Sequence, residues 1–164
     1  MKFSAQEEYG LRCLLRIGKS NSPNGLTIPE ISQLEGLTTH NVAKLLRILR
    51  LGGFIESERG KSGGYKLSTT ADKIIIGEVL AVLGGRLFDT TFCDSHAGIE
   101  KICTNSIDCS IRSLWRIIQR IVDDFLSNTT LQDLLKSEND FAQFVNKLYE
   151  DTLENASINE NLIN

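Results

Sequence analysis

Apolar residues near the start of the chain recur at the three- and four-residue intervals of an α-helix. The first such stretch, residues 3–19, is predicted to be a helix, and the turn sequence SNSPNG (20–25) follows it. The positions with helical spacing on its apolar side are Leu11, Leu14, Leu15 and Gly18, flanked by Tyr9 and Ile17. Cys13 lies toward the same side, and we interpret it as a residue of the buried core.

Two further helical patterns follow and are separated by a glycine. Thr27 and Glu30 have the spacing of a capping box, which predicts a short helix that begins at Thr27 and ends at Gly36. A third helix is predicted to begin at Thr38 or Thr39. The buried stripe of this third helix is predicted to be Val42, Leu45, Leu46 and Leu49. Two helices joined by a glycine turn, with polar side chains early in the second, are typical of a helix-turn-helix.

A predicted β-hairpin comes directly after the third helix. The strand-like segments FIES and YKLS flank the loop ERGKSGG, which carries Arg59 and Lys61. A hairpin in this position is typical of the wing of a winged-helix protein. Amphipathic helix pairs and basic loop residues are each common in proteins that bind no DNA. Their order along this chain is what favours a DNA-binding module.

The second half of the chain is predicted to contain a fourth helix at 74–85 and a long helix from Ser110. The apolar stripe of the long helix is Ile111, Leu114, Trp115, Ile118, Val122 and Phe125, widened by Ile117 and Ile121. Such a stripe outside a small domain favours a dimer element, and the alternative is packing on the helix's own domain. A short capped helix at 129–136 and an amphipathic helix in the acidic tail are also expected.

Charge is distributed unevenly along the 164 residues. The net charge is −3, but residues 1–70 carry +4 (ten Lys/Arg, six Asp/Glu) and residues 71–164 carry −7 (eight and fifteen). Phosphate contacts are therefore expected in the amino half. The N-terminal sequence MKFSAQEEYG lacks the apolar core of a signal peptide, and no apolar run is long enough to span a bilayer. These features predict a cytoplasmic protein without a membrane partner.

Three of the four cysteines, Cys93, Cys103 and Cys109, lie within one polar stretch of 17 residues. Cytosolic thiols are kept reduced, so a structural disulfide is the less favoured interpretation. Three thiolates with one harder ligand suit zinc or an iron–sulfur cluster almost equally, although the C-x2-C pairs of structural zinc sites are absent. No P-loop, dinucleotide fingerprint or nucleophile–base motif is present. The chain is therefore predicted not to be an enzyme, and an electron carrier or small metalloprotein is the least favoured alternative.

Several segments carry a family resemblance, above all GFIESERGKSGGYKLS followed by IGEV, together with the N-terminal helix, the cysteines and SLWR. Over about residues 1–136 the chain resembles the Rrf-type winged helix-turn-helix transcription regulators, in particular the IscR/NsrR-like iron–sulfur regulators. The resemblance implies a homodimer that binds operator DNA and an iron–sulfur cluster, either 2Fe-2S or 4Fe-4S. It implies cysteine ligands at Cys93, Cys103 and Cys109. It places DNA contacts at Thr39, His40, Asn41 and Lys44 and at Arg59 in the hairpin loop. Arg47 and Lys61 are further candidates because of their charge.

The cysteine region departs from the family pattern in two ways. The spacing C-x9-C-x5-C has a longer first interval, and Arg112 stands where IscR-like members carry a histidine ligand. Arginine stays protonated and cannot coordinate a metal. The resemblance to NsrR-like members instead implies a carboxylate from the partner subunit, and Glu8 occupies that position. Glu7 beside it and His96 within the cysteine segment are the alternatives.

The sequence thus predicts a mainly α-helical protein with a small β-hairpin wing and a long dimerisation helix. The expected organisation is a DNA-binding domain at 1–84, a cysteine-rich loop at 85–110, the dimerisation and short helices at 111–136, and an acidic extension at 137–164. The predicted function is a transcription regulator that senses redox, iron–sulfur or nitric oxide status. A metal-free regulator that switches by forming disulfides is the main alternative.

Overall fold

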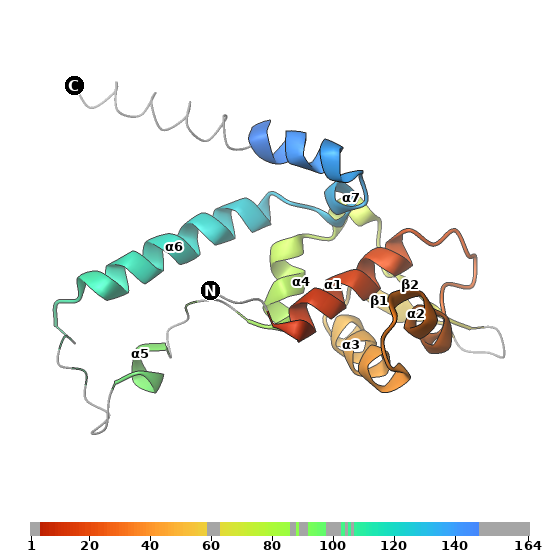
Figure 1. The fold of residues 1–164 in the computed structure, drawn as a ribbon, viewed down its shortest axis with the longest axis horizontal. Helices are drawn as coiled ribbons and strands as arrows, with labels where there is room; N and C mark the ends of the chain where they lie inside the picture. The colour runs from red at the N-terminus through yellow and green to blue at the C-terminus, as the bar shows by residue number, and fades with distance from the viewer. Residues whose placement is uncertain are drawn as a thin grey trace.

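The structure, a computed structural model, describes residues 4–58, 63–85, 88, 92–97, 103, 105 and 107–147. Helices dominate this part of the chain (Figure 1). The helices are α1 (Ala5–Gly18), α2 (Ile28–Glu35), α3 (Thr39–Leu51), the 3-10 helix η1 (Ala71–Lys73), α4 (Ile76–Leu83), α5 (Phe92–Ser95), α6 (Ser110–Ser127) and α7 (Leu131–Leu134). The strands are β1 (Ile55–Ser57) and β2 (Tyr65–Leu67), and residues 138–147 are also helical.

The predicted helix starts in the amino half are confirmed. The Thr27 hydroxyl accepts a hydrogen bond from the Glu30 backbone, and the Glu30 carboxylate accepts one from the Thr27 backbone at 2.7 Å. Of the two candidates for the third helix, Thr38 is the cap, and its Oγ1 accepts the Asn41 N–H at 3.2 Å. Gly36 has φ 65°, the left-handed conformation that the turn between α2 and α3 requires.

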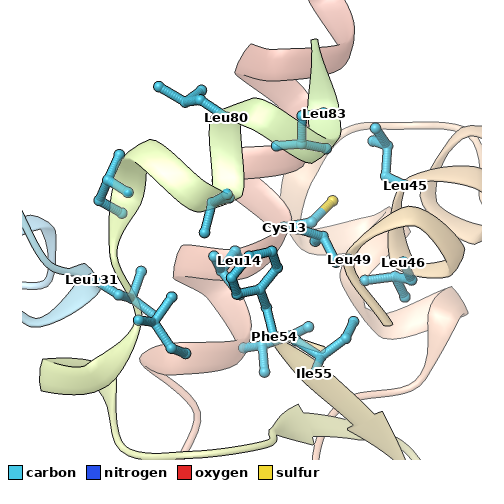
Figure 2. Close-up of a cluster of buried hydrophobic side chains, with 14 of the residues drawn as sticks. Cys13, Leu14, Leu45, Leu46, Leu49, Phe54, Ile55, Leu80, Leu83 and Leu131 are labelled. Atoms are coloured by element: carbon cyan, nitrogen blue, oxygen red, sulfur yellow. The ribbon is translucent and has the colours of Figure 1, made fainter. Parts of the chain in front are cut away.

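The core lies where α1, α3, α4 and β1 meet (Figure 2). All four residues of the predicted α3 stripe are buried, and so is Cys13, whose thiol pKa burial raises to about 11. For α1, the predicted buried side differs from the observed one by a rotation about the helix axis. The buried residues of this helix are Gly10, Cys13, Leu14 and Ile17, whereas Leu11 and Leu15 are half-buried. The face is set by close packing at Gly10, where a Cβ would overlap the Leu83 side chain of α4.

The predicted hairpin is present as the antiparallel pair β1 and β2, with Ile55 opposite Leu67 and Ser57 opposite Tyr65. Leu26, just before α2, adds an isolated bridge to Tyr65 through N–O distances of 2.8 and 3.0 Å. The wing is therefore joined to the start of α2 as well as to the end of α3. Its tip, with Arg59 and Lys61, lies outside the described residues.

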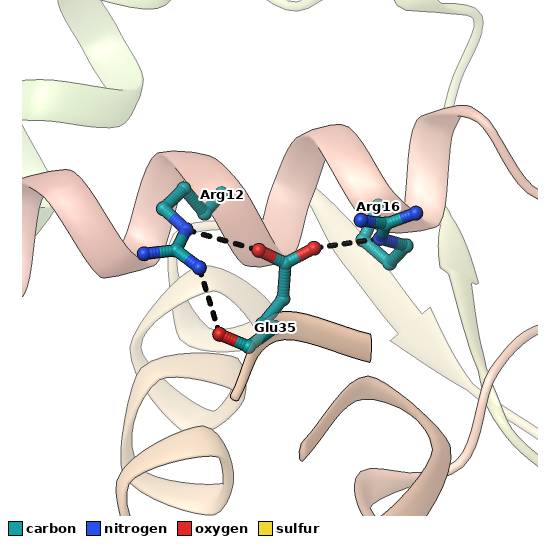
Figure 3. Close-up of polar contacts among 3 residues, drawn as sticks. All are labelled: Arg12, Arg16 and Glu35. Carbon is teal, nitrogen blue, oxygen red and sulfur yellow. Dashed lines mark hydrogen bonds and ion pairs between the residues drawn. The ribbon is translucent and has the colours of Figure 1, made fainter. Parts of the chain in front are cut away.

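A carboxylate at the end of α2 joins α1 to the helix-turn-helix (Figure 3). Glu35 Oε2 accepts the Arg12 Nε–H at 3.0 Å, and its Oε1 accepts the Arg16 Nε–H at 2.6 Å. Arg12 Nη2 also donates to the Glu35 backbone oxygen at 2.7 Å. Burial opposes ionisation of Glu35, but the hydrogen bonds and charges of Arg16 and Arg12 outweigh it and hold the pKa of this carboxyl below its usual value.

Replacing this carboxylate should destabilise the protein. Glu35→Ala removes both side-chain acceptors, and we expect a loss of about 1–2 kcal/mol, because the two partly exposed arginines recover some solvation. Since the native pKa is lowered, the contribution is full above the ordinary value of 4.5 and is lost as the pH falls through the native value. Urea unfolding of both proteins at pH 7 and pH 3 measures this. The control Glu56→Ala, which removes an exposed partner of Lys66, should be nearly neutral, and an equal loss there would contradict the interpretation.

The long helix predicted from Ser110 is confirmed as α6, which extends away from the α1–α3 body in Figure 1. It contacts the body along α4, where a Cβ on Gly77 would lie 3.3 Å from the Leu126 side chain. An isolated bridge between Ile75 and Thr130 fixes the chain beyond α6 against the start of α4. The expected short helix α7 begins with a capping box at Thr130 and packs its buried Leu131 into the core.

Candidate functional site

One face of α3 presents polar side chains to solvent, opposite its buried stripe. The exposed residues on this helix include every predicted recognition position: Thr39, His40, Asn41, Lys44 and Arg47, together with Arg50. Asn41 lies in the first turn, and its amide side chain has the donor and acceptor that adenine matches in the major groove. Lys44 and Arg47 carry charge suited to phosphate contacts. This face therefore has the chemistry of a recognition helix.

The described part of the wing carries one cation that sequence analysis did not single out. Lys66 on β2 lies 3.5 Å from the Glu56 carboxylate and also pairs with Glu58. Hydrogen bonding to Glu58 and the charges of both carboxylates raise the pKa of Lys66. These carboxylates offset its charge within the hairpin, so Lys66 is a poorer phosphate ligand than the cations of α3.

The three clustered cysteines are free thiols. Cys93 is in α5, a short helix that sequence analysis did not anticipate, and Cys109 is the N-cap residue of α6. Cys109 Sγ accepts the Arg112 backbone N–H at 3.3 Å. All three are half-buried, in contrast to Cys13, which is fully buried. The three clustered thiols are therefore more accessible than the core cysteine.

The single chain does not bring a complete ligand set together. Within the described residues, which include all three cysteines, no three His, Cys, Asp or Glu side chains are close enough to hold a metal ion. The donor chemistry nevertheless suits a soft metal centre, because three accessible thiols lie in one segment. A cluster would require that segment to close and a fourth ligand from elsewhere.

The candidate fourth ligands differ in how their side chains are engaged. Glu7 closes the capping box of α1, and its carboxylate accepts the Ser4 N–H at 2.6 Å. Glu8 is exposed on the first turn of the same helix. His96 stacks on the Phe92 ring at 4.2 Å, and its Nδ1 lies 2.8 Å from the Phe92 backbone oxygen. In the tautomer that donates Nδ1–H to this oxygen, Nε2 keeps a lone pair for a metal.

The apolar stripe of α6 is only partly covered. Ile111, Ile117 and Ile121 are 58%, 58% and 64% exposed, and Leu114 and Trp115 are also exposed. Three other members of the stripe, Ile118, Val122 and Phe125, are half-buried. The one fully buried residue of α6 is polar, Gln119. Sequence analysis missed Gln119, although its place beside the apolar stripe was a signal that its amide has a specific partner.

These features together define a winged-helix DNA-binding protein with an exposed recognition helix and a long projecting helix. Residues 3–137 match the model of the Rrf2 family, described as an iron-dependent transcriptional regulator. The chain belongs to this family. It is therefore a DNA-binding transcription regulator and not an enzyme. Among the described helices, none is both long and apolar enough to cross a membrane.

Known proteins resemble the chain over most of its length. It is 30% identical to the HTH-type transcriptional regulator IscR of Vibrio campbellii, over 83% of this chain and 78% of that protein. It is 31% identical to protein rrf2 of Nitratidesulfovibrio vulgaris, over 83% and 88%. The structure of CymR, the global cysteine regulator of B. subtilis, aligns with a TM-score of 0.66 and 28% identity, over 82% of this chain and 96% of CymR.

Proposed function

We propose that this protein is a homodimeric transcription regulator that senses redox, iron–sulfur or nitric oxide status through an iron–sulfur cluster. The ligands would be Cys93, Cys103 and Cys109 of one subunit and Glu8 of the other. The observation that carries this proposal is that three accessible thiols lie within one 17-residue segment, the last of them at the N-terminal end of α6. The exposure of Glu8, against the engagement of Glu7 in a cap, supports the choice of carboxylate. An iron–sulfur cluster would supply an oxidant- and nitric oxide-sensitive centre.

We assign one role to each of the four segments expected from the sequence. Residues 1–84 bind DNA, 85–110 hold the cluster, 111–136 form the dimer, and 137–164 extend beyond the family match. Cys109 caps α6, so a change in the arrangement of the cysteines acts directly on the start of the dimerisation helix. Half-sites on DNA lie about 34–36 Å apart, and a small rotation of the two subunits alters the fit of both recognition helices.

In the proposed complex, α3 lies in the major groove and the wing lies beside the minor groove. Thr39, His40 and Asn41 are at the start of α3, where base edges are met, and Lys44 and Arg47 follow one and two turns later. Arg59 is proposed to enter the minor groove, and Lys61 to contact phosphate near it.

The proposed complex distinguishes residues that contact base edges from residues that contact phosphates, and this distinction can be tested directly. Asn41→Ala should weaken binding to a mapped operator by about 1–3 kcal/mol and relax the preference at one base pair. Lys44→Ala is the matched control on the same face. It should weaken binding to all sequences about equally and reduce the salt dependence of binding. Fluorescence anisotropy on an operator series measures both. A uniform loss for Asn41→Ala would place this residue on the DNA backbone instead.

A metal-free thiol switch is the second candidate. Free thiols are the reduced state from which disulfides form, and Cys93, Cys103 and Cys109 are all free. A structure of the Staphylococcus aureus CymR in an oxidized form is also among those that the chain resembles, with a TM-score of 0.62 and 28% identity. Iron and sulfide analysis after anaerobic purification separates the two candidates.

A further inference from the structure

Gln119 is the one buried residue of α6, with 6% of its surface exposed. Its position is unexpected, since apolar side chains on the same helix, such as Ile117 and Ile121, remain more than half exposed. A buried amide is costly unless both of its ends are hydrogen-bonded. Its burial therefore points to specific partners.

Both ends of the Gln119 amide are engaged. Its Oε1 accepts the backbone N–H of Phe88 at 2.7 Å, and its Nε2 donates to Asp123 Oδ1 at 2.7 Å, one turn further along α6. Phe88 lies 31 residues earlier in the chain, in the segment that leads to the cysteines. The first hydrogen bond therefore ties this segment to the middle of the long helix.

Aromatic contacts continue from Phe88 to the first cysteine. The Phe88 and Phe92 rings lie 5.1 Å apart, and Phe92 stacks on His96 at 4.2 Å. Cys93 follows Phe92 within the single turn of α5, and the His96 backbone N–H closes this turn by donating to the Phe92 and Cys93 carbonyl oxygens. The position of Cys93 is thus linked to Gln119 through one hydrogen bond, one ring contact and the peptide bond between Phe92 and Cys93.

The cysteine segment is consequently attached to α6 at two points. One is covalent, at Cys109, where α6 begins. The other is Gln119, ten residues later and roughly 15 Å along the helix axis. A movement of Cys93 toward Cys109 that keeps the contact between the Phe88 and Phe92 rings would therefore strain the hydrogen bond between Phe88 and Gln119 or shift α6. A groove of about 430 Å³ between α4 and α6, lined in part by Gln119 and Asp123, leaves room for such a movement.

We propose that Gln119 is a positioning residue that transmits the arrangement of the cysteines to the dimerisation helix. It acts through Phe88 and the turn that carries Cys93, and does not itself bind metal or DNA. The regulatory part of this inference rests on the proposed function. The link between Gln119 and Cys93 stands on the contacts of the cluster-free chain.

The test replaces the amide by an apolar side chain of similar size. In cluster-free Gln119→Leu, we expect iodoacetamide to alkylate Cys93 at least about fivefold faster than in the wild type, because the turn that carries it is released. Mass spectrometry follows each cysteine separately, and the alkylation rate of Cys109 should stay within about twofold. Gln132→Leu, which removes an exposed amide from α7, is the matched control and should change neither rate. An unchanged rate for Cys93 in Gln119→Leu overturns the proposed link.

The second readout is the response of operator binding to the cluster. In the wild type, the operator Kd of cluster-loaded protein should differ from that of cluster-free protein by about 5–150-fold, as an increase or a decrease. Gln119→Leu with the same iron content should show a ratio of about twofold or less. If the Kd ratio of Gln119→Leu equals that of the wild type, the transmitting role of Gln119 is overturned. If the wild type itself has the same Kd with and without the cluster, the proposed function is contradicted, and the alkylation rates alone then test the link between Gln119 and Cys93.

Discussion

Cys103→Ala is expected to purify anaerobically without iron or sulfide, whereas the wild type purifies as a coloured protein with both. A cluster held by three thiolates loses one of its ligands in this variant, because alanine supplies no donor atom. Cys103 lies outside the helices, so its replacement should not disturb the fold. Iron and sulfide assays with visible absorbance give the measurement.

The fourth cysteine provides the control for this prediction. Cys13→Ala removes a thiol from the fully buried core, and it should cost stability but leave the cluster in place. Loss of iron in this variant while the fold is retained, or retention of the cluster in Cys103→Ala, would contradict the proposed ligand set.

Subunit mixing extends the same test to Glu8. In a heterodimer of a Glu8→Ala chain and a chain with all three clustered cysteines changed to alanine, one site has three cysteines and an intact Glu8 from the other chain. The second site has neither. We expect one cluster per dimer with wild-type spectra and stability in air, and His96→Ala should leave these properties unchanged. A cluster that decays like that of the Glu8→Ala homodimer would show that the carboxylate comes from the same chain.

Ile121→Asp is expected to dissociate the dimer. Ile121 is 64% exposed in the single chain, and the proposed interface would bury it against a second copy of α6. An unpaired carboxylate there should raise the dimer dissociation constant about 100-fold or more, which corresponds to about 3 kcal/mol. Sedimentation velocity measures the dissociation, and operator affinity should fall with it. Arg116→Asp places the same group on the polar side of α6 and should leave the dimer intact; a monomeric Arg116→Asp or a dimeric Ile121→Asp would contradict this interface.

Local sequence patterns were sufficient to predict most elements of the fold. The four buried leucine and valine positions of α3 follow from their spacing, and the capping boxes at Thr27 and Thr130 follow from pairs three residues apart. Gly36 is likewise identified by the turn that only a residue tolerant of positive φ can make without strain. These features depend only on residues close to one another in the sequence, so the sequence alone is enough to predict them.

Features that depend on distant contacts could not be predicted in this way. The buried side of α1 is set by the close approach of Gly10 to Leu83, and Glu35 meets Arg12 and Arg16 only once α2 has docked on α1. The contact between Gln119 and Phe88 crosses 31 residues. The cysteine segment contains three donor atoms of the proposed site, but the fourth is proposed to come from Glu8 of a second subunit, which no pattern within one chain places.

The central claim is that the state of a cluster at the cysteines changes operator binding. It is tested most directly by measuring operator affinity on one anaerobic preparation before and after the cluster is removed with an oxidant and an iron chelator, with iron and sulfide quantified at each stage. We predict that the starting protein contains iron and sulfide and that its Kd changes by at least about fivefold on their loss. Protein that contains neither, or whose Kd is the same before and after removal, would contradict the claim.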